Sequence, residues 1–392
     1  MNGRVEEEAE RAKARGIGGE KQLSEQVLIT GGAGFIGRFV ADELLAKGCK
    51  VRVLDSLIDQ VHGGKGRPDA LSPEVELIEG DVRDGDAVAR SLRGVDSVVH
   101  LAAEVGVGQS MYAVERYTSV NDVGTAVLFE QLIAKPVRRV VVASSMSIYG
   151  EGLYRDGAGR IVEDAVKPPT PGADGSWDPS GEDGRPLVPV PTPETKRPAL
   201  ASVYAIGKYV QERLTLTLAP AYGMEGAALR LWNAYGPGQA LSNPYTGVLA
   251  IFSSRLLNNQ PPLIFEDGMQ QRDFVHVRDV ARAFMLALFE PAAAGGIFNI
   301  GSGEVRTVTE VASAISSAMG KDIAPEVTGR ARAGDIRHCI PDIGLAEKAL
   351  GYHRREDFME GLAELAEWVA RQTAEDNVAK ARAELEAMGL VA

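Results

Sequence analysis

Residues 30–37 read Thr-Gly-Gly-Ala-Gly-Phe-Ile-Gly, and this octet decides the fold. The apolar run Val27–Ile29 before it predicts a buried strand, and the stretch Phe35–Lys47 after it places apolar side chains along one side of a predicted helix. Three of its glycines are spaced three residues apart: Gly31, Gly34 and Gly37. The first permits a tight turn, the second lets backbone approach a pyrophosphate, and the third lets the helix pack close to the strand. The octet therefore predicts a strand–turn–helix unit whose helix N-terminus binds phosphate.

A carboxylate ends the next predicted strand, Val51–Asp55. Glycines in such a turn can serve geometry alone, but here strand, glycines, helix and acid follow one another in the order that a dinucleotide site requires. Asp55 lies where an acidic residue would accept hydrogen bonds from the adenosine ribose hydroxyls and repel a 2′-phosphate. We therefore predict a site that prefers NAD over NADP. Its expected cofactor-binding residues are Gly31, Gly34, Phe35, Ile36, Gly37 and Asp55.

Composition narrows the class of protein. The 392 residues can form two domains or one large α/β unit, and a hydrophobic content of 45% is ordinary for a globular protein. The net charge of −12 disfavours a nucleic-acid or anionic-membrane surface. Two cysteines, Cys49 and Cys339, suggest neither a disulfide framework nor a cysteine-rich metal site. No apolar stretch approaches membrane-spanning length, and the N-terminus is charged rather than signal-like, so we expect a soluble cytoplasmic protein.

Strand-like and helix-like runs alternate from residue 26 to about 150. Further predicted strands are Val75–Ile78, Ser97–Leu101 and Arg139–Ser144, with helices between them. This alternation predicts a parallel sheet covered by helices on both faces. The predicted fold class is α/β, with a Rossmann-type doubly wound parallel sheet and a smaller C-terminal α/β substrate domain.

Domain boundaries follow from where that pattern breaks. We predict an N-terminal extension at 1–25, an NAD-binding Rossmann domain at 26–228, a mainly substrate-binding domain at 229–372 and a helical tail at 373–392. Residues 151–200 are rich in Pro and Gly and form an insert, an ordered excursion or a flexible flap, because the sheet pattern resumes after it. Some segments of the second domain return to the first. The tail, Glu375–Met388, is expected to form a solvated amphipathic helix that serves as a surface cap or an oligomer contact.

Tyr204 and Lys208 lie four residues apart in the predicted helix 202–218, so they share one face. A lysine near a tyrosine, together with a positively charged nicotinamide, favours the phenolate and lowers the pKa of the tyrosine. Such a phenolate can take a proton from a substrate hydroxyl while hydride leaves the same carbon. A Tyr-x-x-x-Lys pair is common by chance, but the glycine motif upstream favours the catalytic interpretation.

Three serines, Ser144, Ser145 and Ser147, lie at the end of a predicted strand. A strand end delivers hydroxyls to the crevice at the carboxyl edge of the sheet, where ligands of α/β proteins bind. A serine there can hydrogen-bond the reacting oxygen and relay its proton to Tyr204, or it can simply satisfy backbone groups. Both the catalytic and the structural role stay open, and different serines can fill the two roles.

Together these motifs resemble the extended short-chain dehydrogenase/reductase family, which contains NAD-dependent nucleotide-sugar epimerases and dehydratases. The resemblance covers about residues 26–370 and includes Thr30–Gly37, Asp55, Gly80–Val82, His100–Ala103, Asn121, the serine segment, Tyr204 with Lys208, Asn233–Gln239, Arg272–Val277 and Phe298–Gly303. It implies that the cofactor is also bound by Asp81, Val82, Leu101, Ala102, Ala103, Asn121, Tyr204 and Lys208. It further implies that Ser145, Tyr204 and Lys208 are catalytic.

The same resemblance implies a nucleoside-diphosphate sugar as substrate, bound by Ser145, Asn233, Arg272, Arg332 and Asp335. An anionic ligand on an acidic protein needs local arginines, and guanidinium groups grip phosphate in a bidentate way. The alternative is that these arginines are solvated or paired with Asp273 and Asp335.

The residues after Ser145 separate the reactions of the family. Its dehydratases place an Asp-Glu pair there and its decarboxylases a glutamate in this segment, whereas this chain has Met146 and Ser147. The resemblance then implies a 4-epimerase, which oxidises its substrate to a 4-keto sugar and returns hydride to the opposite face without net redox change. The alternatives are a nucleotide-sugar dehydrogenase, reductase or dehydratase of the same family, and a non-catalytic NAD-responsive binding protein on the same fold.

The insert, its flanks and the segment Leu101–Ser110 resemble the dTDP-L-rhamnose 4-epimerase-like branch of this family. Members of that branch often carry paired cysteines in the insert, but residues 151–200 contain neither Cys nor His, so we expect no metal. The family also implies a homodimer, here through the helices near Val123–Leu132 and 202–218. Neither nucleic acid nor membrane is an expected partner.

Overall fold

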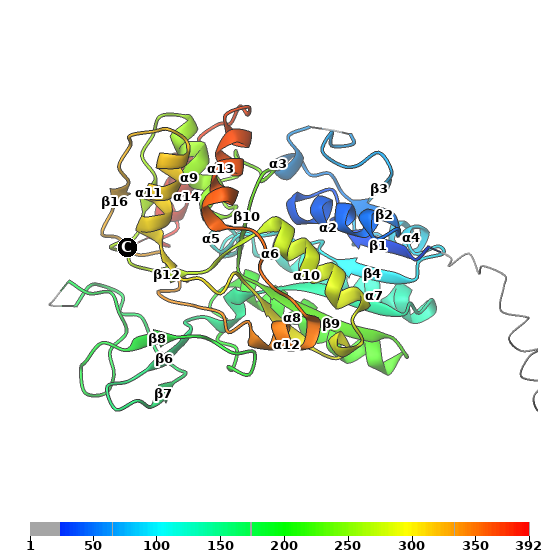
Figure 1. Ribbon diagram of the computed structural model, residues 1–392, viewed down its shortest axis with the longest axis horizontal. Helices are drawn as coiled ribbons and strands as arrows, with labels where there is room; N and C mark the ends of the chain where they lie inside the picture. The colour runs from blue at the N-terminus through cyan, green and yellow to red at the C-terminus, as the bar shows by residue number, and fades with distance from the viewer. Residues whose placement is uncertain (1–23, 65, 173–174, 333, 392) are drawn as a thin grey trace, which may run out of the picture.

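The computed structural model describes residues 24–64, 66–172, 175–332 and 334–391. At its centre lies a seven-stranded sheet, parallel throughout, in the order β14-β9-β5-β4-β1-β2-β3 (Figure 1). The strands are β1 Gln26–Thr30, β2 Lys50–Asp55, β3 Glu76–Glu79, β4 Ser97–His100, β5 Arg139–Ser145, β9 Glu225–Leu231 and β14 Ile297–Ile300. The strand order reverses at β1, and doubly wound sheets bind ligands at the carboxyl ends of the strands at such a point. The prediction of a Rossmann-type sheet is confirmed.

Helices cover both faces of this sheet because successive strand residues point to opposite sides. In β1, Val27 and Ile29 pack in a core with α2 and α10, whereas Leu28 packs in a second core with α4 and α7. These four helices are α2 Phe35–Ala46, α4 Gly85–Ser91, α7 Gly124–Ala134 and α10 Val277–Phe289. Two further helices, α8 Val203–Ala221 and α12 Gly344–Leu350, also pack against the sheet. Burial on both faces explains why the strands read as apolar runs without alternation.

Gly37 sets how closely α2 approaches the turn after β1. A Cβ atom at this position would lie 2.5–2.7 Å from backbone atoms of Gly32, which cannot move aside as a flexible side chain could. We predict that Gly37→Ala lowers the free energy of unfolding by about 1–3 kcal/mol, the usual cost of overpacking. Denaturant unfolding checks this against Gly64→Ala, because a Cβ at Gly64 meets nothing within 4 Å. Equal stability of the two variants would contradict the close approach.

A second group of elements lies beside the main sheet and has its own apolar core, which includes Phe252, Ile315 and Leu362 (Figure 1). Its helices are α9 Val248–Leu257, α11 Val308–Ala318 and α13 Phe358–Val369. Its strands are β10 Asn233–Tyr235, β11 Leu263–Ile264, β12 Gln271–Arg272, β13 Phe274–His276, β15 Arg306–Thr307 and β16 Glu326–Val327. They pair as β10 with β13, β11 with β16 and β12 with β15. The domain boundary near residue 229 stays a prediction.

The insert contains a small antiparallel sheet in the order β7-β6-β8, which projects away from the main sheet (Figure 1). Its strands are β6 Leu153–Arg155, β7 Ile161–Val162 and β8 Val188–Val190. Of the two alternatives for 151–200, the described residues therefore show the ordered excursion.

Buried charges anchor the insert to the second group of elements. Arg337 is only 1% exposed, and its guanidinium donates to Asp178 of the insert at 2.7 Å. It also donates to Asp267 at 2.5 Å and to Glu266 at 3.1 Å. Lys167 of the insert pairs with Glu266 at 2.5 Å. Together these side chains hold the insert in place by ion pairs.

The remaining elements are short helices and the tail. They are α3 Asp59–His62, α5 Val107–Ser110, α6 Val114–Thr118, η1 Ser119–Val123, η2 Met146–Tyr149, η3 Pro291–Ala293 and α14 Val378–Ala387. The predicted helix in the tail is present, and it buries Ala381 and Leu385 while Lys380 and Glu386 are exposed, as expected for an amphipathic surface helix. The predicted extension at 1–25 lies outside the described residues apart from 24 and 25. Among the helices described, none is long and apolar enough to cross a membrane.

Candidate active site

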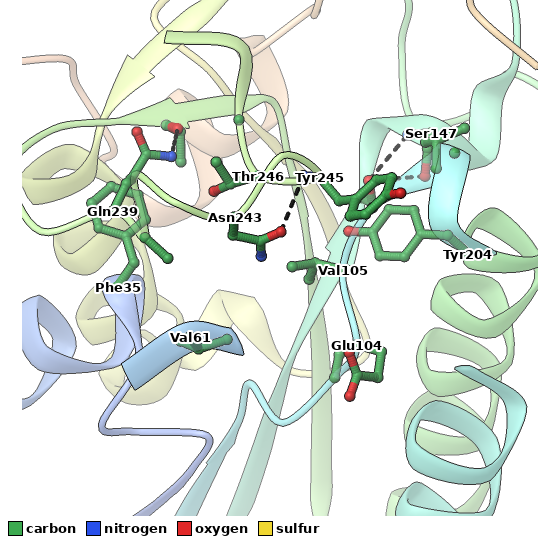
Figure 2. Close-up of a pocket in the computed structure, with 18 of the residues that line it drawn as sticks. Phe35, Val61, Glu104, Val105, Ser147, Tyr204, Gln239, Asn243, Tyr245 and Thr246 are labelled. Atoms are coloured by element: carbon green, nitrogen blue, oxygen red, sulfur yellow. Dashed lines mark hydrogen bonds between the residues drawn. The ribbon is translucent and has the colours of Figure 1, made fainter. Parts of the chain in front are cut away.

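A cavity of about 670 Å³ lies where the main sheet meets the second group of elements. Its walls include the carboxyl ends of β1, β2, β4, β5 and β9 with the loops that follow them. The loop that carries Asn243, Tyr245 and Thr246 lies across the cavity from Val61 and Glu104 (Figure 2). Of all the cofactor-binding and substrate-binding residues predicted from the sequence, only Asn121 does not line this cavity.

The turn after β1 leaves room for a ligand that approaches the backbone closely. Gly31 has a φ of +68°, and a Cβ there would lie 2.8 Å from backbone atoms of Ala102, so this position requires glycine. The N-cap residue of α2 is Gly34, which has no side chain that could cap the first turn of the helix. The N-terminus of α2 is therefore available to an anion, as a dinucleotide pyrophosphate requires.

Asp55 ends β2 at the wall of the cavity, as predicted. The backbone amides of Ala33 and Leu57 donate to its two carboxylate oxygens, both at 3.0 Å. His62, a residue without any sequence motif, also lines the cavity, with its Nε2 3.4 Å from Asp55 Oδ1. These contacts hold the carboxylate where it can accept hydrogen bonds from ribose hydroxyls.

Asp81 and Asn121 lie differently with respect to the cavity. Asp81 lines the cavity, but its carboxylate forms an ion pair with Arg83 at 2.6 Å, and this hydrogen bond lowers the pKa of Asp81. Asn121 is fully buried in η1; its Oδ1 accepts from the amide of Glu104 at 2.7 Å and its Nδ2 donates to the carbonyl of the same residue at 3.1 Å. The expectation that Asn121 reaches the cofactor is therefore corrected: it fixes the backbone of the segment 101–104, which does line the cavity.

Tyr204 at the start of α8 and Ser145 at the end of β5 meet in the cavity. Burial raises the pKa of Tyr204, while a hydrogen bond with Ser145 lowers it. Ser147 donates to Ser145 Oγ from its amide at 3.2 Å and from its hydroxyl at 3.0 Å (Figure 2). Ser144 instead donates to the buried carboxylate of Glu212 at 2.7 Å. Ser144 therefore bonds to a side chain, whereas Ser145 both accepts from a backbone amide and lies beside the phenol of Tyr204.

Lys208, one helical turn after Tyr204, heads a buried polar chain. Its Nζ donates to Gln211 Oε1 at 2.8 Å, and Gln211 continues to Thr125 at 3.0 Å and to His100 at 3.2 Å. Burial lowers the pKa of Lys208 to about 7 and that of His100 to about 3. Burial is the largest effect on the pKa of Tyr204, and the Lys208 ammonium donates to Gln211. The lowering of the Tyr204 pKa by Lys208 together with the nicotinamide stays a prediction.

Arg272 offers a guanidinium to an anion. It lines the cavity and donates to three backbone carbonyl groups, those of Gln271, Ile336 and Arg337. The carboxylate of Asp273 accepts from the backbone amides of residues 302 and 303 instead. The alternative in which Arg272 pairs with Asp273 is therefore wrong, and within the described residues no carboxylate forms an ion pair with Arg272.

The other predicted substrate residues lie in the same cavity. Arg332 pairs with Asp335 at 2.8 Å, so for this arginine the alternative of a carboxylate partner is confirmed. The Arg332 guanidinium also lies 4.4 Å from the centroid of the Phe265 ring. Asn233 Nδ2 donates to the carbonyl of Asp273 at 2.7 Å. The fold thus gathers residues that are about a hundred positions apart in the chain.

Each carboxylate in the described lining of the cavity already has partners. Asp55, Asp81 and Asp335 are bound as described above, and Glu104 accepts from Arg116 at 2.7 and 2.8 Å. Met146, which stands where dehydratases place an acid, brings its Sδ within 3.7 Å of the Asn233 amide. The arrangement supplies the Tyr204 phenol and its neighbouring hydroxyls for proton transfer, but no acid pair among the described lining residues.

Several lining residues belong to no motif. They are Asn243, Tyr245 and Thr246 from an irregular segment, and Val378, Ala381, Arg382, Leu385 and Leu390 from α14 and the turn after it. The segment has no periodicity from which its role could be read. In α14, the apolar pair Ala381 and Leu385 at a spacing of four is a signal of a buried face.

Comparison with known proteins places the chain. The model of the NAD dependent epimerase/dehydratase family matches residues 27–172 and 180–301. The dTDP-L-rhamnose 4-epimerase of Burkholderia thailandensis is 34% identical over 352 residues, which cover 89% of this chain and 96% of that protein. A dTDP-glucose 4,6-dehydratase of an Actinoplanes species is 28% identical over 353 residues, which cover 88% of this chain and 97% of the dehydratase.

Solved structures of epimerases share the fold. The UDP-glucose 4-epimerase of Thermotoga maritima with UDP-glucose has a TM-score of 0.72 at 31% identity, and the match covers 88% of this chain and 99% of that one. The UDP-glucose 4-epimerase of Thermus thermophilus in complex with NAD has a TM-score of 0.69 at 31% identity. This match covers 89% of this chain and 100% of that one. With a family model that spans both groups of elements and a cavity lined by the family's motifs, the chain belongs to the NAD-dependent epimerase/dehydratase family.

Proposed function

We propose that the protein is an NAD-dependent nucleotide-sugar 4-epimerase. The observation that carries this proposal is one cavity in which Tyr204 and Ser145 lie together with Arg272, whose guanidinium bonds only to carbonyl groups among the described residues. The glycine turn and Asp55 fit the pyrophosphate and adenosine ribose of NAD, and Arg272 fits a diphosphate. Relatives named as 4-epimerases support the assignment.

Proton transfer falls to Tyr204 in this proposal. Bound NAD supplies the acceptor and donor of hydride. Tyr204 takes the proton of the C4 hydroxyl and returns it to the 4-keto oxygen after the sugar has turned in the cavity. Ser145 hydrogen-bonds the same sugar oxygen and is itself oriented by Ser147. Lys208 holds the nicotinamide ribose, and its charge, with that of the nicotinamide, offsets the effect of burial on the phenol.

Epimerisation fits the site better than dehydration does. Eliminating water needs an acid and a base in addition to Tyr204, and the carboxylates that line the described part of the cavity are bound to arginines or backbone amides. Positions 146 and 147, next to Ser145, hold a thioether and a hydroxyl. Neither side chain can act as the acid of that reaction at neutral pH.

Turnover without added cofactor tests the proposal. We expect the purified protein, incubated with dTDP-L-rhamnose, dTDP-glucose or UDP-glucose, to form a C4 epimer of at least one of them, detected by NMR. Because the hydride returns to the sugar, no reduced cofactor should accumulate. Stoichiometric formation of NADH would point to a dehydrogenase instead, and a 4-keto-6-deoxy product to a dehydratase.

We also propose that the protein is a cytoplasmic homodimer. Val123 at the end of η1 and Ile206 on α8 are 50% and 43% exposed, and these are the helices that the family expectation assigns to the contact. Exposed apolar side chains on adjacent helices favour packing between two copies. We expect sedimentation to show a dimer that Ile206→Asp dissociates, while the exposed Val166→Asp in the insert leaves it intact. A monomeric parent protein would contradict the proposal.

A further inference from the structure

The C-terminal helix α14 forms one wall of the cavity. Ala381 and Leu385 are buried, and four side chains of the helix line the cavity: Val378, Ala381, Arg382 and Leu385. The methyl groups of Leu385 lie 3.5–3.6 Å from the position of a Cβ on Gly108, in the short helix α5 that follows β4. The helix thus reaches from the second group of elements to the main sheet side of the site.

Both ends of α14 are tied to elements that line the site. Before the helix, Asp376 pairs with Arg255 of α9 at 3.3 Å. After it, Val391 forms an antiparallel bridge with Arg332, the cavity residue that pairs with Asp335. A helix held at both ends beside the proposed substrate residues is a fixed part of the site rather than a loosely attached tail.

A carboxylate on α14 binds the phenol of Tyr245, which lines the cavity, and that of its neighbour Tyr112. Glu384 Oε2 accepts from the hydroxyl of Tyr245 at 2.9 Å and from that of Tyr112 at 3.2 Å, and the two hydroxyls are 2.6 Å apart. Burial raises the pKa of Tyr245, so the phenol keeps its proton and donates it to the carboxylate. Hydrogen bonds to a charged acceptor are among the stronger ones in proteins.

Tyr245 connects this carboxylate to the reacting end of the cavity. Its ring lines the cavity, and its Cβ lies 2.9 Å from the position that a Cβ on Gly106 would occupy. Gly106 belongs to the segment after β4 whose neighbours Glu104 and Val105 line the same space (Figure 2). A displacement of Tyr245 would therefore change the shape of the cavity next to Tyr204.

We infer that α14 is a substrate-binding element and that Glu384 is a positioning residue, which holds Tyr245 against the nucleoside-diphosphate sugar. This inference rests on the proposed function for the identity of the ligand. The family model ends at residue 301, and the dTDP-L-rhamnose 4-epimerase is matched over 96% of its length by 89% of this chain. Glu384 belongs to no motif of the family that the sequence shows.

Binding measurements with Glu384 variants test the inference. We expect Glu384→Ala to weaken binding of UDP-glucose and dTDP-glucose, measured by calorimetry, by about tenfold or more, the usual effect of losing a hydrogen bond to a charged group. Glu384→Gln should restore most of the affinity, because its amide still accepts from one phenol. The control is Lys380→Ala, on the exposed side of the same helix, which should bind like the parent.

A thermodynamic cycle separates positioning from general stability. Tyr245→Phe should weaken binding of the sugar nucleotides, and adding Glu384→Ala to it should cost little more, because the two residues act as one unit. NAD affinity and the melting temperature should stay near those of the parent in all three variants. Parent-like binding by Glu384→Ala overturns the inference. So does an equal loss of NAD affinity, which would show a merely structural role.

The same data distinguish this inference from the proposed function. If the parent protein binds the sugar nucleotides but forms no C4 epimer, the proposed reaction is wrong while the role of Glu384 is still decided by the affinities. If the parent protein binds none of them, both are overturned.

Discussion

Tyr204→Phe is expected to lower kcat for C4 epimerisation by about 10²- to 10⁴-fold, the range that general acid–base catalysis contributes. The substitution removes only the hydroxyl that meets Ser145, and the ring can stay in place. We therefore expect the affinities for NAD and for the sugar nucleotide to change little. Steady-state kinetics on the NAD-loaded variant, with calorimetry for both ligands, measures the split between catalysis and binding.

Tyr209→Phe is the matched control, because it makes the same change on the same helix. Tyr209 packs against the apolar cluster that contains Trp232 and Ile148, and it does not line the cavity. Its kcat should stay within about twofold of the parent, since a substitution away from the site changes little. Full epimerase activity of Tyr204→Phe would contradict the assignment of Tyr204 as the group that transfers the proton.

Arg337→Met is expected to lower the free energy of unfolding by about 3–5 kcal/mol, the cost of removing one partner from a buried ion pair. The variant would leave Glu266, which is 1% exposed, with Lys167 alone, and would leave Asp178 of the insert with His338 alone. Denaturant unfolding measures the loss. Because the Arg337 carbonyl accepts from Arg272, we also expect weaker binding of the sugar nucleotide.

Arg185→Met provides the comparison within the insert. The Arg185 side chain is 75% exposed, and its ion pair with Asp183 spans 3.8 Å. A surface pair of this kind contributes about 0–1 kcal/mol, so the variant should be nearly as stable as the parent. If both arginine variants lost the same small amount, the buried charges would not be what anchors the insert.

The elements built from local patterns could be predicted from the sequence. The octet at 30–37, the strand that ends in Asp55 and the pair Tyr204 and Lys208 each depend on neighbours within one strand–turn–helix unit or one helical turn. The structure accordingly has β1, α2, β2 and α8 within a few residues of the predicted bounds. The resemblance then supplied Arg272, Arg332 and Asp335, which no local pattern connects.

Long-range contacts explain what the sequence could not show. Asp178 and Arg337 are 159 positions apart, and nothing near either residue indicates its partner. Asn121 matches a family motif, yet its side chain forms hydrogen bonds with the backbone of Glu104 and does not face the cavity. The helix at 378–387 could be predicted, but its amphipathic pattern does not say whether the apolar side meets solvent, a second copy or a cavity.

An isotope experiment tests the central claim most directly, namely that one hydrogen leaves C4 of the sugar and returns to it through bound NAD. The purified protein is incubated, without added cofactor, with a sugar nucleotide that carries deuterium at C4, and the product is examined by NMR. The account predicts a C4 epimer that keeps its deuterium at C4 in ordinary water. An epimer that carries hydrogen from water at C4 would contradict it.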